Sequence, residues 1–181
     1  MMGIPQPPKP VKYMAGLLSS QLQLLEQVET ELAVFLGDVE QRSQTLAWNI
    51  SQFYKQEMGP NLLRRFVSFT PLHSPGKLAE FKLRTQQIEN LFRASGDLGS
   101  ARRLNVDPGY LDAFKLVLAS TKNASQRIYL ESGIYAESTL LYYDGSFHGM
   151  SYTYRDYLWP QTQQFLASLR STYLQQLRQL P

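Results

Sequence analysis

The chain has 181 residues, of which 43% are hydrophobic and 18% are charged. This composition is typical of one globular domain, and it excludes an intrinsically disordered chain and a collagen-like repeat. The net charge is only +3, and the small basic excess is spread over both halves of the chain, which argues against a polybasic nucleic-acid-binding arm. The absence of cysteine excludes disulfides, thiolate metal sites and cysteine nucleophiles.

Residues 1–10 contain four prolines, which predicts an extended lead-in ahead of a domain formed by residues 11–181. The same stretch has no apolar run of the kind found in signal peptides. No later segment of the sequence approaches the roughly 18 apolar residues of a membrane-spanning helix. We therefore expect a cytoplasmic protein that makes no contact with a membrane.

Hydrophobic periodicity predicts a strand and then a helix at the start of the domain. Residues 11–18 form a short apolar-rich run, which favours a strand. Within residues 21–36 apolar side chains recur every three or four positions, and Gly37 stands where a helix commonly ends in a left-handed residue. Two β-rich, aromatic runs, residues 45–50 and 65–72, predict strands joined by a long connection.

Two further helices are predicted in the middle of the chain. Residues 74–92 begin with a Ser-Pro pair, which is typical of a helix N-terminus, and carry an apolar stripe. Residues 102–106 predict a short strand. The Asp-Pro pair at 107–108 then indicates the start of another helix, which directs apolar residues such as Phe114 inward and ends near Ser120.

The last third of the chain predicts a β-meander followed by a helix. Residues 127–130 and 134–143 are β-rich runs, and the Asp-Gly pair at 144–145 favours the tight turn of a hairpin that continues into residues 146–152. Residues 160–180 carry leucines on one face, which predicts an amphipathic C-terminal helix. Such a stripe packs on its own domain more often than on a partner.

Together these elements predict a single α+β domain. The strands and helices of the first two-thirds follow the βαββαβ order of a ferredoxin-like core. The helix over residues 107–121, the β-meander and the C-terminal helix extend this core. No internal repeat and no Gly/Ser-rich linker divides the chain.

The motifs of several common chemistries are absent. Gly76-Lys77 lacks the earlier glycine and the following hydroxyl of a P-loop, and it is better explained as the first turn of a helix. No glycine fingerprint for a dinucleotide follows the first strand. Because His73 and His148 are the only histidines and cysteine is absent, we expect neither zinc nor haem, whereas the carboxylates leave Mg²⁺ open as a cofactor.

Charged and polar residues are concentrated between residues 102 and 111, where a predicted strand ends. Asp107 is either the N-cap of the following helix, since aspartate is among the best N-caps, or a functional carboxylate. Such a carboxylate serves a metal, a sugar hydroxyl or a proton transfer. Lys115 lies among apolar residues of the same predicted helix, so its ammonium either reaches solvent past them or points into a pocket.

A second group of polar residues lies in the β-meander. Arg127 and Tyr129 share one face of their predicted strand, and Glu137 lies across from them if the register permits. One interpretation is a cross-strand Arg–Glu ion pair. The other is a phosphate or carboxylate clamp, in which arginine supplies a planar fork and glutamate orients it. Arg64 and Arg65 are placed to join this group from the opposite side.

Several ordered blocks of the sequence share the pattern of a known family. The blocks are Gly16-Leu17-Leu18-Ser19-Ser20, Glu57-Met58-Gly59, Arg64-Arg65-Phe66-Val67-Ser68-Phe69, Asn105-Val106-Asp107-Pro108-Gly109-Tyr110-Leu111, Lys115 to Lys122, Arg127-Ile128-Tyr129-Leu130, Gly133-Ile134-Tyr135-Ala136-Glu137, and Tyr154 with Asp156-Tyr157. On these blocks the chain, from Gly3 to about Tyr157, resembles the domain of unknown function 4416 family of bacteria and archaea.

The resemblance implies no established activity. Members of the family are sometimes labelled GTP-binding, which the missing P-loop of this chain does not support. The family pattern has an acidic residue after Lys122 and often a histidine before Arg127, whereas this chain has Asn123 and Gln126 at those positions. This difference argues against a histidine-dependent or carboxylate-metal role for the loop.

Three classes of function fit these observations. The first is a ligand-binding or enzymatic domain for an anionic small molecule, such as a nucleotide or a phosphorylated metabolite, in which Asp107 or Glu137 acts as a base or a Mg²⁺ ligand. The residues that we expect to bind this ligand are Arg65, Lys115, Lys122, Arg127 and Tyr129. The second class is an RNA-binding module that stacks bases on aromatic residues. The third is a non-catalytic protein-interaction domain that uses the C-terminal helix.

Overall fold

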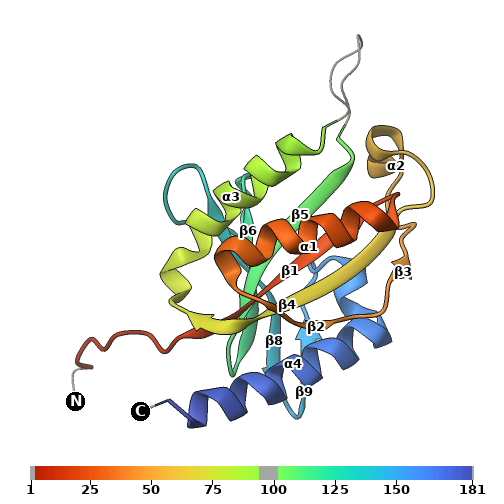
Figure 1. Ribbon diagram of the computed structural model, residues 1–181. Coiled ribbons are helices and arrows are strands. Elements are labelled where there is room, and N and C mark those ends of the chain that lie inside the picture. Colours follow the sequence, from red (N-terminus) through yellow and green to blue (C-terminus); the bar gives the residue numbers. More distant parts are fainter. Residues whose placement is uncertain (1–2, 94–101, 181) are drawn as a thin grey trace.

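The computed structural model describes residues 3–93 and 102–180. Within these ranges the chain forms one antiparallel sheet of nine strands, with helices on both faces (Figure 1). In chain order the elements are β1 (Val11–Ser19), α1 (Leu22–Leu36), β2 (Val39–Arg42), β3 (Leu46–Ala47), α2 (Gln52–Met58), β4 (Leu63–His73), the 3₁₀ helix η1 (Pro75–Lys77), α3 (Leu78–Leu91), β5 (Leu104–Leu111), β6 (Lys115–Ser120), β7 (Ile128–Tyr129), β8 (Tyr135–Tyr143), β9 (Ser146–Gly149), the 3₁₀ helix η2 (Arg155–Leu158) and α4 (Pro160–Arg178). The sheet runs β2-β4-β1-β5-β6-β8-β7, with β3 beside β4 and β9 beside β8. The predicted α+β class is confirmed.

Strand β1 lies at the centre of the sheet between β4 and β5, and all nine of its residues are buried. Successive side chains of a strand point to opposite faces. Tyr13, Ala15 and Leu17 therefore belong to one hydrophobic core, whereas Met14 belongs to the core on the other face. Burial on both faces explains why the sequence of β1 is a nearly continuous apolar run.

Helices α1 and α3 cover one face of the sheet, where their apolar stripes pack around Tyr13 (Figure 1). Helix α1 is followed by Gly37, whose φ of 88° lies in the region that favours glycine. The predicted Ser-Pro start of the second helix is confirmed, because Oγ of Ser74 accepts a hydrogen bond of 3.3 Å from the backbone N–H of Gly76. This turn, η1, continues directly into α3.

Helix α4 covers the opposite face of the sheet. Leu166, Leu169 and Tyr173 of α4 are buried in one core with Met14 of β1 and Phe66 of β4. The apolar stripe of the C-terminal helix therefore packs on its own domain, as its amphipathic pattern predicts. Leu174 and Leu177, farther along α4, pack against the same core but are only partly buried.

The helix predicted over residues 107–121 is wrong, because β5 and β6 form a hairpin there. Asp112 holds the turn, since its Oδ1 accepts hydrogen bonds from the backbone N–H groups of Phe114 (2.7 Å) and Lys115 (2.9 Å). Phe114, which was predicted to point inward, is 71% exposed. The continuous buried run at residues 116–119 is the pattern of a strand in the middle of a sheet, and it outweighs the helical spacing of the surrounding apolar residues.

The structure also shows how an Asp-Pro-Gly sequence fits into a central strand. Pro108 lies opposite Ala15 of β1, and pairing with β6 begins only at Gly109, so the missing N–H of proline interrupts no pairing between β5 and β6. A Cβ atom at Gly109 would lie 2.5 Å from the carbonyl oxygen of Val117, so only glycine lets β6 approach this closely. Asp107 lies within β5 and is therefore not a helix N-cap.

The segment between α1 and β4 differs from the prediction in its details. The strand predicted over residues 45–50 is reduced to the two residues of β3, and the long connection contains α2, which the sequence pattern does not indicate. In the β-meander, β7 has two residues and β9 ends at Gly149. Strand β2 and strand β6 were not predicted, whereas each of the seven predicted strands corresponds at least in part to an observed one.

Candidate functional site

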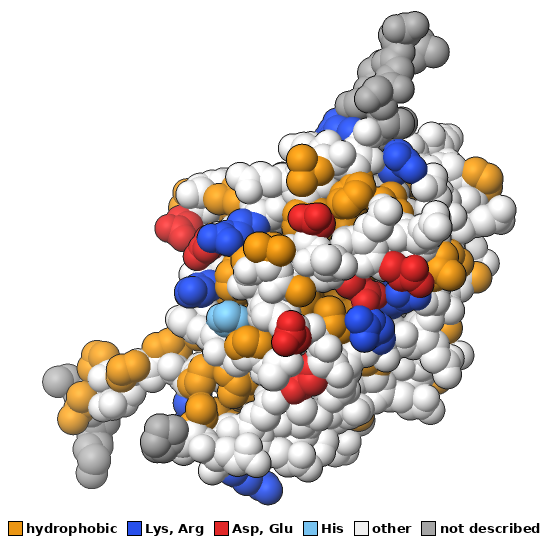
Figure 2. Space-filling view, viewed as in Figure 1, with side chains coloured by type: hydrophobic (Ala, Val, Ile, Leu, Met, Phe, Trp, Pro, Cys, Tyr) orange, Lys and Arg blue, Asp and Glu red, His pale blue; other side chains and the backbone are white. Residues whose placement is uncertain are grey.

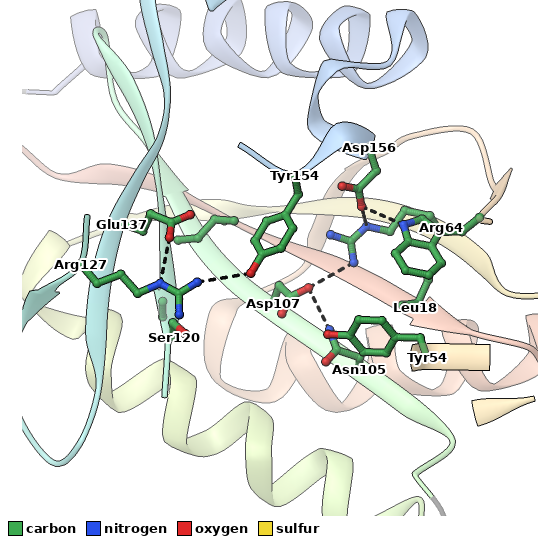
Figure 3. A pocket seen from close by; sticks show the side chains of 13 residues that line it. Leu18, Tyr54, Arg64, Asn105, Asp107, Ser120, Arg127, Glu137, Tyr154 and Asp156 are labelled. Carbon is green, nitrogen blue, oxygen red and sulfur yellow. Dashed lines mark hydrogen bonds and ion pairs between the residues drawn. The ribbon is translucent and has the colours of Figure 1, made fainter. Parts of the chain in front are cut away.

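Two adjoining pockets open at one end of the central strands, beside the segment that carries η2. Figure 3 shows the inner of the two. The inner pocket has a volume of about 80 Å³ and the outer pocket about 310 Å³. The residues that line both are Tyr54, Asn105, Asp107, Ala119, Ser120 and Tyr154. Pockets that bind small molecules typically measure about 300–1,000 Å³, so the two together suit a small ligand.

Arg64 of β4 lies beside the inner pocket as a buried charge. Its Nε is 2.9 Å from Oδ2 of Asp156, and its Nη1 is 3.2 Å from Oδ2 of Asp107. Its Nη2 donates a hydrogen bond of 3.2 Å to the hydroxyl of Tyr157. Gly16 of β1 makes this position possible, because a Cβ atom there would lie 2.7 Å from Nη2 of Arg64. A glycine in the central strand thus provides the space for a guanidinium.

Asp107 is the carboxylate that lines both pockets, and Figure 3 shows it in the inner one. Its Oδ2 accepts hydrogen bonds from Nδ2 of Asn105 (2.8 Å) and Nη1 of Arg64 (3.2 Å), whereas no donor in the described part of the chain contacts Oδ1. Burial alone would raise the pKa of this carboxyl, but the charges of Arg64 and Lys82 and the two hydrogen bonds outweigh burial and lower the pKa below its usual value. Asp107 is therefore ionised at neutral pH and suited to accept hydrogen bonds or bind a cation.

A second ion pair lies on another side of the inner pocket, as Figure 3 shows. Nε of Arg127 is 2.8 Å from Oε2 of Glu137, and both side chains are buried. Gln126 donates a hydrogen bond of 2.9 Å to the same oxygen. The other two nitrogens of Arg127 donate to the carbonyl of Lys122 (2.9 Å) and the hydroxyl of Tyr154 (3.3 Å). The ion pair between Arg127 and Glu137, one of the two interpretations from sequence, is thus present.

Cationic side chains line the outer pocket. Arg102 forms an ion pair with Glu57, with 2.8 Å between Nη2 and Oε2. Lys82 of α3 is only 7% exposed, and its ammonium donates a hydrogen bond of 2.9 Å to the carbonyl of Val106. Lys122 follows β6 and is exposed, and no carboxylate of the described residues pairs with it. The outer pocket therefore combines a paired arginine with two lysines that carry no ion pair.

Three of the residues predicted to bind a ligand lie away from these pockets. Arg65 points to the face that carries α1, where its Nη1 is 2.8 Å from Oε1 of Glu29. Lys115 lies at the far end of β6 and pairs with Asp112 at 2.6 Å. Tyr129 is 57% exposed and lines neither pocket. The predicted residues that the structure brings together are Asp107, Lys122, Arg127 and Glu137.

Two pocket residues, Lys82 and Trp48, were not singled out from the sequence, although a signal existed for Lys82. Lys82 follows Leu78 by four positions and so lies on the buried stripe of its helix. Arg64 was named from the sequence together with Arg65, and its spacing of two positions from Phe66 places it on the same face of β4. Trp48 carries no such signal, because its place in the inner pocket depends on the path of the connection between α1 and β4.

Within residues 3–93 and 102–180, no three His, Asp or Glu side chains are grouped so that they could hold a metal ion. In the same ranges, no helix combines the length and the apolar character that crossing a bilayer requires.

The fold and the site define an α+β protein with a mixed-charge pocket at one end of an antiparallel sheet. The chain belongs to the family described as Domain of unknown function (DUF4416), whose model matches residues 9–173. This match confirms the resemblance seen in the sequence blocks and extends it into α4. No curated protein matches the chain.

Proposed function

We propose that the protein binds a small anionic molecule, such as a nucleotide or a phosphorylated metabolite, in the two adjoining pockets. The observation that carries this proposal is the buried ammonium of Lys82, which lines the outer pocket and makes one hydrogen bond within the described chain. An ammonium has three donors, and a buried charge is costly unless it is paired. The charge of Lys82 lowers the pKa of Asp107 and opposes the rise in the pKa of Glu89, but no ion pair of the described residues joins its ammonium to either carboxylate. A bound anion would supply a direct partner.

The neighbouring residues support the same assignment. Lys122 lines the outer pocket without an ion pair, and Arg102 faces the same space. Asp107 and Glu137 offer two carboxylates to the inner pocket. Because Mg²⁺ is commonly held by one or two carboxylates together with phosphate oxygens of a ligand, these residues fit Mg²⁺ only in combination with a phosphorylated molecule.

We also infer that the first two-thirds of the chain forms a ferredoxin-like core. The strand order β2-β4-β1-β5, antiparallel throughout, and the placement of α1 and α3 on one face support this inference. The pocket then lies where the added strands β6 and β8 continue the sheet beyond β5.

RNA binding is less well supported. RNA-binding modules with this strand order stack bases on the aromatic residues of an open sheet face. Here α4 covers that face, and Phe66 and Tyr157 are buried beneath it. The other face carries α1 and α3, and acidic and basic side chains are intermingled over it without a large patch of either sign (Figure 2). Binding through α4 to a protein partner is likewise not favoured, since its leucines are packed.

The proposal is tested by thermal unfolding of the purified protein with inorganic phosphate, sugar phosphates and nucleotides, with and without Mg²⁺, at constant salt. A ligand at 100 times its dissociation constant stabilises the folded state by about 2.7 kcal/mol, which raises the Tm of a protein of this size by about 5–11 °C. The Lys122→Ala variant should reduce this shift. The matched control is Lys115→Ala, which removes a lysine far from the pockets and should leave the shift unchanged. A panel without any shift, or equal effects of both variants, would contradict the proposal.

A further inference from the structure

The two pockets differ in the charged residues that line them. The charged residues that line only the outer pocket are Lys82, Arg102, Lys122, Glu57 and Glu89. Those that line only the inner pocket are Arg64, Arg127, Glu137 and Asp156, and Asp107 lies between the two. Apart from the shared Asp107, the outer pocket has three cations and two carboxylates, whereas the inner pocket has two of each, and both of its cations are held in ion pairs.

Two buried side chains have unused hydrogen-bonding capacity, one in each pocket. Glu137 is 2% exposed and accepts its hydrogen bonds from Gln126 and Arg127 through Oε2, whereas no donor of the described residues contacts Oε1. Lys82 is 7% exposed and retains two unused donors in the outer pocket. Buried polar groups are rarely left unpaired, so the pocket suits a ligand with an anion at one end and hydrogen-bond donors at the other.

Resting on the function proposed above, we propose that the ligand is the phosphate ester of a short polyol or sugar. The phosphate lies in the outer pocket beside Lys82 and Lys122, and two hydroxyl groups enter the inner pocket. These hydroxyls donate hydrogen bonds to Oδ1 of Asp107 and Oε1 of Glu137, two carboxylate oxygens of the inner pocket that no donor of the described residues contacts. The hydroxyl of Tyr154, which accepts from Arg127, is free to donate to the same ligand.

The relative size of the two pockets favours the hydroxyl groups as the part of the ligand that enters the inner pocket. The inner pocket has a volume of about 80 Å³, against about 310 Å³ for the outer pocket. The smaller end of the ligand therefore lies in the inner pocket, and any larger part lies in the outer pocket or in solvent.

The existing ion pairs favour hydroxyl groups over an ammonium at the same end of the ligand. Glu137 is already paired with Arg127, and Asp107 with Arg64. The positive charge of a ligand ammonium would be repelled by these two arginines, whereas a hydroxyl group needs only the free lone pairs of the carboxylates. An apolar group would leave both oxygens unpaired, which sites built for hydroxyl groups strongly reject.

The test compares four probes by isothermal titration calorimetry on the full chain: glycerol 3-phosphate, n-propyl phosphate, phosphoethanolamine and inorganic phosphate. Glycerol 3-phosphate is expected to bind about tenfold or more tightly than each of the other three, since the loss of one hydrogen bond to a charged group corresponds to about this factor. In the Asp107→Asn variant the amide oxygen keeps the hydrogen bonds to Arg64 and Asn105, and an NH₂ donor then takes the place of Oδ1. This variant should reduce the preference for glycerol 3-phosphate over n-propyl phosphate to about threefold or less. Glu137→Gln should act in the same way, and it serves as the second variant if Asp107→Asn does not fold.

The outcomes separate this inference from the function on which it rests. Equal affinities for glycerol 3-phosphate and n-propyl phosphate, with both weakened by Lys122→Ala, would overturn the polyol assignment and leave anion binding intact. Tightest binding of phosphoethanolamine would overturn the choice of hydroxyl over ammonium. If none of the four probes binds at millimolar concentration, the polyol assignment is overturned, and the proposed function is contradicted as well if the nucleotides of the thermal-unfolding panel also give no shift.

Discussion

Replacing Arg64 by methionine is expected to destabilise the fold by about 3–5 kcal/mol, because it leaves a buried carboxylate without its cation. The side chain of Asp156 is 5% exposed, and its remaining partner is Nε1 of Trp48 at 3.2 Å. Asp107 is 32% exposed and contributes less, since solvent screens its interaction with Arg64. Methionine keeps an apolar contact with the ring of Phe66, over which the guanidinium lies at 4.7 Å, so the loss is mainly electrostatic.

Urea denaturation of the parent and the variant measures this loss in the free energy of unfolding. In thermal unfolding, the same loss should lower the Tm by about 6–20 °C for a chain of this length. Asp156→Asn in the Arg64→Met background should recover most of the stability, because it removes the unpaired charge and keeps an acceptor for Trp48. The matched control is Arg84→Met. Arg84 forms an exposed pair with Glu80, and its loss should cost less than about 0.5 kcal/mol. Equal losses in Arg64→Met and Arg84→Met would refute the assignment of a buried ion pair to the pocket wall.

Three further predictions concern the core, the central strand and acid stability. Leu169→Ala should lower the free energy of unfolding by about 2–5 kcal/mol in urea, whereas Leu180→Ala, at an exposed position, should leave it unchanged, and equal effects would show that α4 is not part of the core. Gly16→Ala should lower the free energy of unfolding in urea by about 1–3 kcal/mol, because the new Cβ atom displaces the guanidinium of Arg64. An unchanged free energy of unfolding would contradict the close contact between Gly16 and Arg64. Ionised Asp107 stabilises the fold above its unfolded pKa of about 3.8, and this contribution is lost as the pH falls through the lower folded pKa. Asp107→Asn should therefore flatten the stability–pH curve below about pH 4, and an unchanged acid limb would argue against this linkage.

Local signals in the sequence were sufficient for most elements of the fold. The Asp-Gly pair at 144–145 predicted a hairpin turn, and both residues have the positive φ angles that a type I′ turn requires, 47° and 80°. The Ser74-Pro75 start and the apolar stripe of the C-terminal helix were predicted on equally local grounds. Such patterns succeed because capping, turn geometry and amphipathicity depend on neighbours in the chain.

The error at residues 107–121 arose where local and non-local signals disagreed. An Asp-Pro pair and helical spacing of apolar residues favoured a helix. The strand forms because Pro108 lies at a position where β6 does not pair, and because Gly109 lets β6 approach. Neither condition can be inferred without knowing which strand lies next to β5.

The site was only partly predictable for the same reason. Arg127 and Glu137 lie close in sequence, so strand parity could suggest their contact. Arg64 and Arg65 are neighbours in sequence, yet they point to opposite faces of β4 and join different groups of residues. The contact between Arg64 and Asp107 depends on β1 lying between β4 and β5, which is a property of the sheet order.

The most direct test of the account is to locate the binding site of glycerol 3-phosphate by ¹H–¹⁵N NMR titration. The account predicts that the indole N–H signal of Trp48 and the amide signals of Asn105, Asp107 and residues 120–122 shift with ligand concentration, because these residues line the two pockets. Signals near Glu29 and Arg65, which line a separate groove on the α1 side, should not move. Shifts confined to that groove, or no shifts at millimolar ligand, would contradict the assignment of the pockets as the binding site.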